Sequence, residues 1–168
     1  LCLNLGVDKN IIKKSLKKFS GVQRRMTKIF SKNKNDFYDD YAHHPTEIAS
    51  ILEGVKNVYQ NRKIITIFEP HRYSRVLSLK NKFVRSFEKS DLVLICPMYA
   101  AGEKRDSRFK IIKFSKQISK LSKTQVIIIK NYKEIQKFLK KNLVSDEIII
   151  GMGAGVISKH MRELETFL

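Results

Sequence analysis

Hydrophobic and polar positions along the chain follow two alternating patterns. Short apolar runs rich in β-branched residues are typical of buried strands, and they occur at residues 63–68, 92–96, 125–129 and 147–150. Between them, apolar residues recur every three or four positions, which predicts helices at residues 45–58, 75–87, 111–121, 132–139 and 156–163. Strands that alternate with helices in this way favour a mostly parallel sheet covered on both faces.

The first part of the main pattern is different. Residues 22–30 and 36–41 alternate loosely around a polar turn at 31–35, which predicts an antiparallel hairpin. Together with the later elements, this hairpin predicts a Rossmann-like α/β fold. We expect an open, mostly parallel sheet with helices on both faces and an initial antiparallel hairpin.

A further helix is predicted before the hairpin. Asp8 offers an N-cap for apolar residues at helical spacing, and Gly21 is expected to close that helix. We therefore predict a domain boundary near Gly21. The chain does not begin with Met, and we expect it to be part of a longer protein.

The net charge of +18 over 168 residues favours anionic partners: nucleotides, phosphorylated small molecules or nucleic acid. The lysines are spread along the whole chain, and no nucleic-acid recognition motif accompanies them. We therefore expect no nucleic-acid partner, and a basic nucleic-acid-binding module remains an alternative. The length fits one ordinary domain.

Cysteine usage and hydropathy indicate the compartment. Cys2 and Cys96 fit neither a disulfide framework nor a zinc-ligand spacing, which favours a reducing environment. The first residues do not form a secretory signal, and no apolar run approaches the roughly 18 residues that span a bilayer. We expect a cytoplasmic location and no membrane partner.

Four polar clusters each follow a predicted strand. They lie at residues 39–47, 69–75, 97–105 and 151–155. Because ligands of open parallel sheets bind outside the carboxyl ends of the strands, these clusters are expected to meet at one edge. The sequence therefore predicts one site built from all four.

Two of these clusters carry the most informative chemistry. Arg72 and Arg75 place two guanidinium groups at the start of a helix, where a carboxylate or phosphate is the natural partner. His43 and His44 follow two aspartates but match no zinc motif, so we predict no metal site. We favour the interpretation that a single imidazole orients a substrate or moves a proton.

The glycine turn at residues 151–155 carries a weaker signal. It lacks the full dinucleotide-binding pattern because Val156 occupies the last glycine position, and close helix-to-strand packing explains its glycines adequately. No P-loop sequence occurs in the chain. If a nucleoside triphosphate is used, another part of the protein must hold its phosphates.

The segments DDYAHHPTE (39–47) and FEPHRYSR (68–75) resemble the C-terminal domain of the Mur ligases of peptidoglycan synthesis. GVQRR (21–25), YAAGE (99–103) and GMGAG (151–155) agree in type and order, whereas Met26 and Val156 depart from the residues usual there. By this resemblance, residues 1–20 are the end of a central ATPase domain with a linker helix, and residues 21–168 are the C-terminal domain. The HRYSR segment favours the member that adds L-alanine; a sister ligase that adds a murein tripeptide remains an alternative.

The resemblance implies an ATP- and Mg²⁺-dependent ligase. The carboxylate of UDP-N-acetylmuramate is phosphorylated, and the amine of L-alanine attacks the acyl phosphate to form an amide. ATP phosphates and Mg²⁺ would be bound mainly by the central domain. This chain alone is therefore expected to be inactive without its own N-terminal and central domains.

The resemblance also assigns residues. Arg25 and Asp40 match positions that contact the ATP ribose. The L-alanine pocket is matched by five residues: Tyr41, His43, His71, Arg72 and Arg75. The arginines would pair with the carboxylate of alanine, and His43 is the expected catalytic residue, since it would place the amine near the acyl phosphate.

Overall fold

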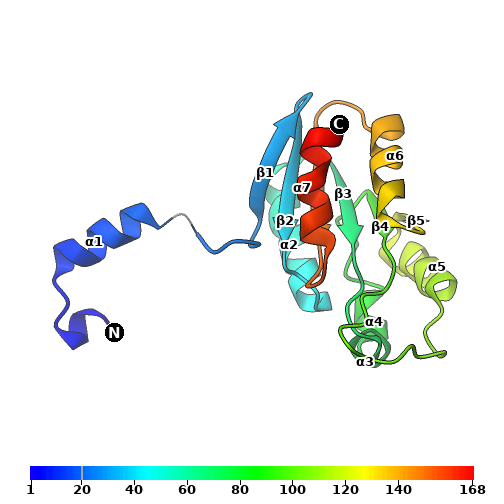
Figure 1. Cartoon of the computed structure of the whole chain (residues 1–168), viewed down its shortest axis with the longest axis horizontal. Helices are drawn as coiled ribbons and strands as arrows, with labels where there is room; N and C mark the ends of the chain where they lie inside the picture. Colours follow the sequence, from blue (N-terminus) through cyan, green and yellow to red (C-terminus); the bar gives the residue numbers. More distant parts are fainter. Residues whose placement is uncertain (20) are drawn as a thin grey trace.

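A computed structural model describes residues 1–19 and 21–168. A sheet forms its centre (Figure 1). The six strands of this sheet have the order β1-β2-β6-β3-β4-β5. The strands are β1 (Thr27–Lys32), β2 (Asn35–Asp40), β3 (Lys63–Phe68), β4 (Leu92–Ile95), β5 (Gln125–Ile128) and β6 (Glu147–Met152). β1 and β2 pair antiparallel, and every other pair is parallel. The predicted fold class is confirmed.

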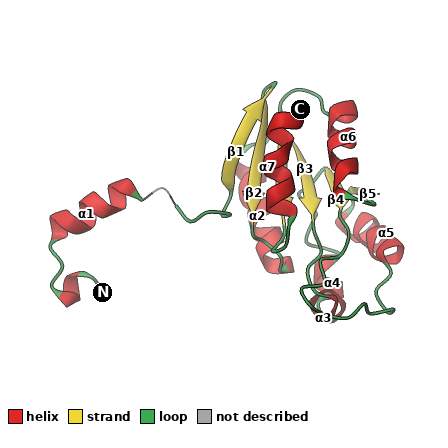
Figure 2. Ribbon diagram, viewed as in Figure 1, coloured by secondary structure: helices red, strands yellow, loops and turns green. Residues whose placement is uncertain are grey.

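Helices lie on both sides of this sheet (Figure 2). They are the α-helices α2 (Pro45–Val58), α3 (Tyr73–Ser78), α4 (Lys80–Phe83), α5 (Ile111–Ser122), α6 (Tyr132–Asn142) and α7 (Ile157–Phe167). The 3₁₀ helix η1 (Leu3–Leu5) and the α-helix α1 (Lys9–Lys18) come earlier in the chain and bury none of their residues. Apolar side chains of α2 to α5 fill one core, and those of α6 and α7 fill the other. The chain therefore builds the three layers that its alternating pattern predicts.

β6 shows why the strand runs are continuously apolar. It lies between β2 and β3, and all six of its residues are buried. Ile148 and Ile150 contribute to the core under α2 to α5, whereas Ile149 contributes to the core under α6 and α7. A strand covered on both faces has no polar side, so its sequence does not alternate.

The first hairpin differs in detail from the prediction. Its strands are joined by Asn33 and Lys34 alone, with φ of 52° and 62°, as a two-residue type I′ turn requires. The predicted five-residue turn is therefore too long, because Ser31 and Lys32 continue the ladder to Asn35. Residues 22–26 precede β1 and are not part of a strand.

Two helix predictions also need correction. The helix predicted at 75–87 is two short helices, α3 and α4, interrupted at Leu79 with φ −103° and ψ 15°. The interruption accompanies complete burial of Val76 and Phe83 in the same core. The first helix ends at Lys18 with an extended Phe19 as its C-cap, before Gly21. Its predicted N-cap, Asp8, is confirmed by hydrogen bonds from Asn10 N and Ile11 N.

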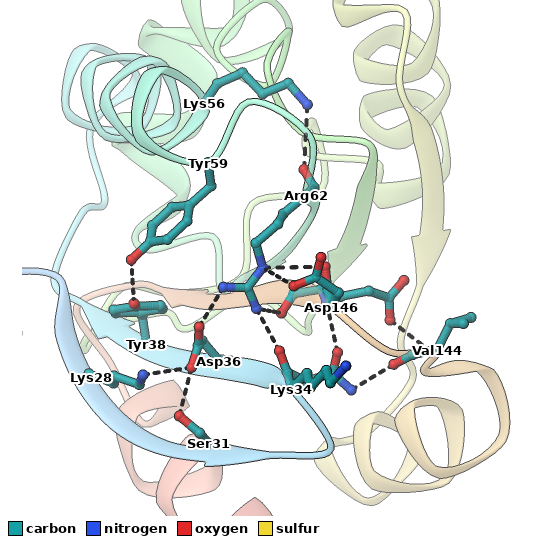
Figure 3. Close-up of polar contacts among 12 residues, drawn as sticks. Lys28, Ser31, Lys34, Asp36, Tyr38, Lys56, Tyr59, Arg62, Val144 and Asp146 are labelled. Carbon is teal, nitrogen blue, oxygen red and sulfur yellow. Dashed lines mark hydrogen bonds and ion pairs between the residues drawn. The ribbon is translucent and has the colours of Figure 1, made fainter.

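The amino-terminal edge of the parallel strands is held by a polar network around Arg62 (Figure 3). The Arg62 guanidinium donates to Asp36 Oδ2 at 2.5 Å, to Lys34 O at 2.8 Å and to Glu147 O at 2.9 Å. Asp36 also accepts from Lys28 and Ser31. One side chain thus joins the hairpin to β6 at the edge opposite the predicted site.

Candidate functional site

The carboxyl ends of the strands bring the predicted clusters together. β2 ends at Asp40, β6 at Met152, β3 at Phe68 and β4 at Ile95, and these strands run parallel, so their ends share one edge. The His43 and His71 rings, from the loops after β2 and β3, lie 5.7 Å apart between centroids. The predicted meeting of the acidic histidine segment and the arginine segment is confirmed.

The start of α2 fixes His43 and His44. Pro45 occupies the first helical turn, and Glu47 Oε2 accepts the backbone N–H groups of His43 at 3.1 Å and His44 at 3.2 Å. Burial alone would raise the pKa of Glu47, but these N–H groups and the nearby His43 hold it below its ordinary value. His44 Nδ1 accepts from Thr46 N, so His44 acts as the N-cap.

His43 is left with one ring nitrogen for chemistry. Its Nδ1 lies 2.8 Å from the backbone oxygen of Tyr41, which can only accept, so Nδ1 carries the proton of the neutral ring. Nε2 is then the basic nitrogen. The Tyr41 ring packs edge-on against His43 with centroids 5.1 Å apart and is 39% exposed.

His71 is held from two sides. Its ring stacks on Tyr99 with centroids 5.4 Å apart, and its Nδ1 lies 3.0 Å from Arg75 Nη1. Burial, followed by the charges of Arg75, His43 and Arg72, lowers the pKa of His71 below its ordinary value. A neutral His71 accepts from Arg75 at Nδ1 and presents Nε2–H as a donor.

Arg72 stands at the N-cap of α3 in a conformation that is unusual for a residue with a side chain, with φ 66° and ψ 125°. Its N–H donates to Tyr99 O at 2.9 Å. Within the described ranges, 1–19 and 21–168, its exposed guanidinium has no hydrogen bond or ion pair. The loop after β4 thus fixes the backbone and leaves the guanidinium available.

The two predicted ribose residues differ in exposure. Arg25 is exposed, whereas Asp40 is 1% exposed, and its two oxygens accept from Ala42 N and Met26 N, each at 2.7 Å. Burial raises the pKa of Asp40, although these N–H groups and Arg25 act against the rise. The structure brings both residues to the strand edge, where Arg25 is exposed and the Asp40 carboxylate is buried.

Sequence reasoning missed Arg24, which shapes this part of the site. Its Nη2 donates to Gly153 O at 2.6 Å, and its guanidinium lies 4.6 Å from the centroid of the Tyr41 ring. Arg24 therefore joins the entry of the hairpin to the glycine turn after β6. Its position beside Arg25 in the GVQRR segment was the available signal.

Glu103, in the YAAGE segment, was also left without a role. Its carboxylate accepts from Ser74 N at 3.0 Å and Ser74 Oγ at 2.5 Å at the start of α3. These hydrogen bonds lower the pKa of Glu103. The loop after β4 thereby holds the helix start that carries both arginines.

In the part of the chain that the structure describes, no three His, Cys, Asp or Glu side chains are grouped so that they could bind a metal ion. Over the same residues, the helices are too short or too polar to cross a bilayer.

Comparisons with known proteins identify the family. The family model for the Mur ligase, glutamate ligase domain, matches residues 24–155. A UDP-N-acetylmuramate–L-alanine ligase of Pelagibacter ubique is 48% identical over 98% of this chain and 35% of its own length. The same enzyme of Ruthia magnifica is 37% identical over 94% of this chain and 34% of its own length. The chain thus spans about a third of the curated relatives it matches.

Solved structures show the same fold. UDP-N-acetylmuramate-alanine ligase of Thermotoga maritima matches with a TM-score of 0.76 and 25% identity, over 98% of this chain and 34% of that one. A murein peptide ligase of Psychrobacter arcticus matches with a TM-score of 0.71 and 21% identity, over 92% of this chain and 32% of that one.

Proposed function

The chain belongs to the Mur ligase family, and we propose that it forms the C-terminal part of an ATP-dependent ligase joining L-alanine to the carboxylate of UDP-N-acetylmuramate. The observation that carries the proposal is the convergence of two guanidinium groups and two imidazoles at one strand edge. Such a ligase would work in the cytoplasm, where ATP and the sugar nucleotide are available.

Arg72 and Arg75 would bind the carboxylate of L-alanine. Arg72 has no partner of its own among the described residues, and Arg75 is oriented by His71 Nδ1 at 3.0 Å. Guanidinium groups bind carboxylates with paired hydrogen bonds, so two of them at one helix start suit a free amino acid. The neutral His71 adds an N–H donor without adding a charge. Tyr41 would line the same pocket.

His43 would receive the proton of the alanine amine. An ammonium group must lose a proton before nitrogen can attack an acyl phosphate. Nδ1 of His43 is occupied by Tyr41 O, and Nε2 makes no hydrogen bond to any residue that the structure describes, so Nε2 would accept that proton. The contact with Tyr41 O fixes the tautomer and the direction of the ring. This is the role that makes His43 the proposed catalytic residue.

Arg25 and Asp40 would hold the ATP ribose. A carboxylate can accept hydroxyl donors, and the exposed Arg25 places a cation beside it. The phosphates of ATP and Mg²⁺ would be bound mainly by the central domain of the longer protein. Bound Mg²⁺–ATP supplies the phosphoryl group that activates the sugar carboxylate.

Helix α1 would belong with that central domain, as the division at residue 20 implies. The amphipathic helix buries none of its residues: Ile11 is 59% exposed and Leu16 is 67% exposed. The family match also begins after it, at residue 24. Apolar residues on one helix face are stabilised by burial, so a neighbouring domain would cover them.

The test uses the full-length protein that contains this chain. Phosphate release is measured with ATP, Mg²⁺ and UDP-N-acetylmuramate, and either L-alanine or murein tripeptide is the acceptor. We expect release that depends on L-alanine. Release with the tripeptide and none with L-alanine would assign the protein to the sister activity instead.

A further inference from the structure

A fully buried carboxylate lies directly behind the proposed L-alanine pocket. Glu69 follows β3, precedes Pro70 and His71, and is 0% exposed. Its Oε2 accepts a hydrogen bond from the Tyr132 hydroxyl, at the start of α6. Its Oε1 is buried and has no hydrogen-bond partner among the described residues. Burying a carboxylate that has only one hydrogen-bond partner costs folding free energy, so Glu69 calls for a role beyond packing.

The other oxygen of Glu69 is enclosed by parts of the site. A Cβ atom placed on Gly155 would lie 2.3 Å from Glu69 Oε1 and 2.6 Å from Tyr99 Cγ. The carboxylate, the glycine turn and the Tyr99 ring therefore meet at one point. Tyr99 is the ring on which His71 stacks.

Backbone hydrogen bonds connect Glu69 to the proposed substrate residues. Glu69 N donates to Met152 O at 2.9 Å, Tyr99 N donates to Pro70 O at 2.8 Å, and Arg72 N donates to Tyr99 O at 2.9 Å. The segment between Glu69 and Arg72 is thus held to β6 and to the loop after β4. A change at the Glu69 carboxylate would act on both His71 and Arg72.

Tyr132 is itself fixed by the helices on the far face of the sheet. Its ring stacks on His160 of α7, with centroids 4.0 Å apart and planes 14° apart, and His160 Nδ1 lies 2.9 Å from Glu163 Oε2. Burial and the hydrogen bond to Glu69 raise the pKa of Tyr132, so its hydroxyl keeps its proton and remains a donor. α6 and α7 contain none of the predicted substrate residues.

We propose that Glu69 and Tyr132 are positioning residues for L-alanine binding, because their hydrogen bond fixes the Pro70–Arg72 segment and the Tyr99–His71 stack from behind. This inference rests on the proposed function. It extends the alanine site to α6, which the sequence motifs leave out.

The test compares three variants of the full-length ligase. Tyr132→Phe removes only the hydroxyl and leaves Glu69 buried without its donor. Glu69→Gln keeps an acceptor oxygen for Tyr132. Tyr59→Phe is the matched control, since it removes a hydroxyl that pairs with Tyr38 OH at 3.0 Å on the other face of the sheet, near Arg62 (Figure 3). Initial rates over a range of L-alanine concentrations, at saturating ATP, give KM and kcat for each.

We expect Tyr132→Phe to raise the KM for L-alanine about tenfold, which corresponds to about 1.4 kcal/mol, and to change kcat less than twofold. Glu69→Gln should stay within threefold of the wild type, and Tyr59→Phe should leave the KM unchanged. Lower thermal stability of Tyr132→Phe with an unchanged alanine KM would overturn the proposal, because a purely structural contact gives that result.

A second measurement separates this inference from the proposed function. Histidine labelled with ¹³C at Cε1 reports the surroundings of each ring by NMR, and His71→Gln identifies the His71 signal. We expect Tyr132→Phe to shift the His71 signal, whereas Tyr59→Phe should not. If the wild type shows no L-alanine-dependent activity, the proposed function fails, and the His71 signal alone decides the positioning role: an unmoved signal overturns it.

Discussion

Replacing Arg62 with Met should destabilise the fold more than any other single cation change at the amino-terminal edge of the sheet (Figure 3). The substitution keeps the aliphatic part of the side chain and removes the guanidinium. Asp36 Oδ2, Lys34 O and Glu147 O then lose their donor. The Arg62 and Asp36 side chains are only 15% and 14% exposed, so water replaces the lost hydrogen bonds poorly.

The size of the stability loss depends on the hydrogen-bond donors that Asp36 keeps in Arg62→Met. Breaking a buried ion pair by removing one partner costs roughly 3–5 kcal/mol. Asp36 keeps Lys28 and Ser31 as donors, and the second acidic partner, Asp146, is 64% exposed. We therefore expect a loss of about 2–3 kcal/mol, at the lower end of that range or just below it.

Urea denaturation of the 168-residue chain, followed by circular dichroism, measures this loss. Lys56→Met is the matched control, because Lys56 makes only a 3.5 Å contact with Arg62 O and a 3.9 Å ion pair with Asp91 in the same region. The control should lose less than about 0.5 kcal/mol. Equal losses in the two variants would refute the reasoning.

The pH dependence gives a second check on Arg62. Burial would raise the pKa of Asp36, but hydrogen bonds from Lys28, Ser31 and Arg62 bring it far below its ordinary value of 3.8. Because the folded-state pKa is depressed, ionised Asp36 stabilises the fold above that value, and the contribution is lost as the pH falls further. The difference between wild type and Arg62→Met should therefore narrow below about pH 4. A difference independent of pH between 7 and 3 would contradict the role of Asp36.

Three further predictions concern the site in the full-length ligase. Arg72→Ala should raise the KM for L-alanine roughly 10- to 100-fold, which is the effect of losing one charged hydrogen bond. The control Arg108→Ala, at a side chain 80% exposed, should leave that KM unchanged. Unchanged alanine kinetics in Arg72→Ala would reject the carboxylate assignment. Asp40→Asn should raise the KM for ATP more than that for L-alanine, and the reverse order would count against the ribose assignment. Gly155→Ala should lower the free energy of unfolding by about 1–3 kcal/mol and weaken L-alanine binding, because its methyl group would lie 2.3 Å from Glu69 Oε1. Calorimetry measures the first effect and steady-state kinetics the second. A fully stable and fully active variant would contradict this prediction, since the turn would then accommodate the methyl group without cost.

The parts of the fold that sequence could predict are those set by local pattern. Continuous apolar runs and helical spacing locate most elements to within a few residues, and Pro45 with Glu47 marks the start of α2 correctly. The rule that ligand-binding loops follow the carboxyl ends of parallel strands predicts from the sequence that His43 and His71 lie close together, as they do.

The parts that sequence could not predict depend on contacts between distant residues. Glu69 and Tyr132 are 63 positions apart, and their hydrogen bond exists only because α6 starts beside the end of β3. The interruption at Leu79 contains no Gly or Pro, so no local signal marks it. Arg62 looks like a charged residue at a helix end until the sheet supplies its acceptors.

The position of β6 has a consequence for how the protein is made. The strand nearest the end of this sequence pairs with β2 on one side, at Asp36 and Ile148, and with β3 on the other, at Lys63 and Glu147. Until the ribosome has released that segment, the hairpin and the β3-β4-β5 group have no strand to join them, and their inner edges stay open. Nascent chains would therefore depend on rapid completion or on a chaperone to avoid pairing with one another.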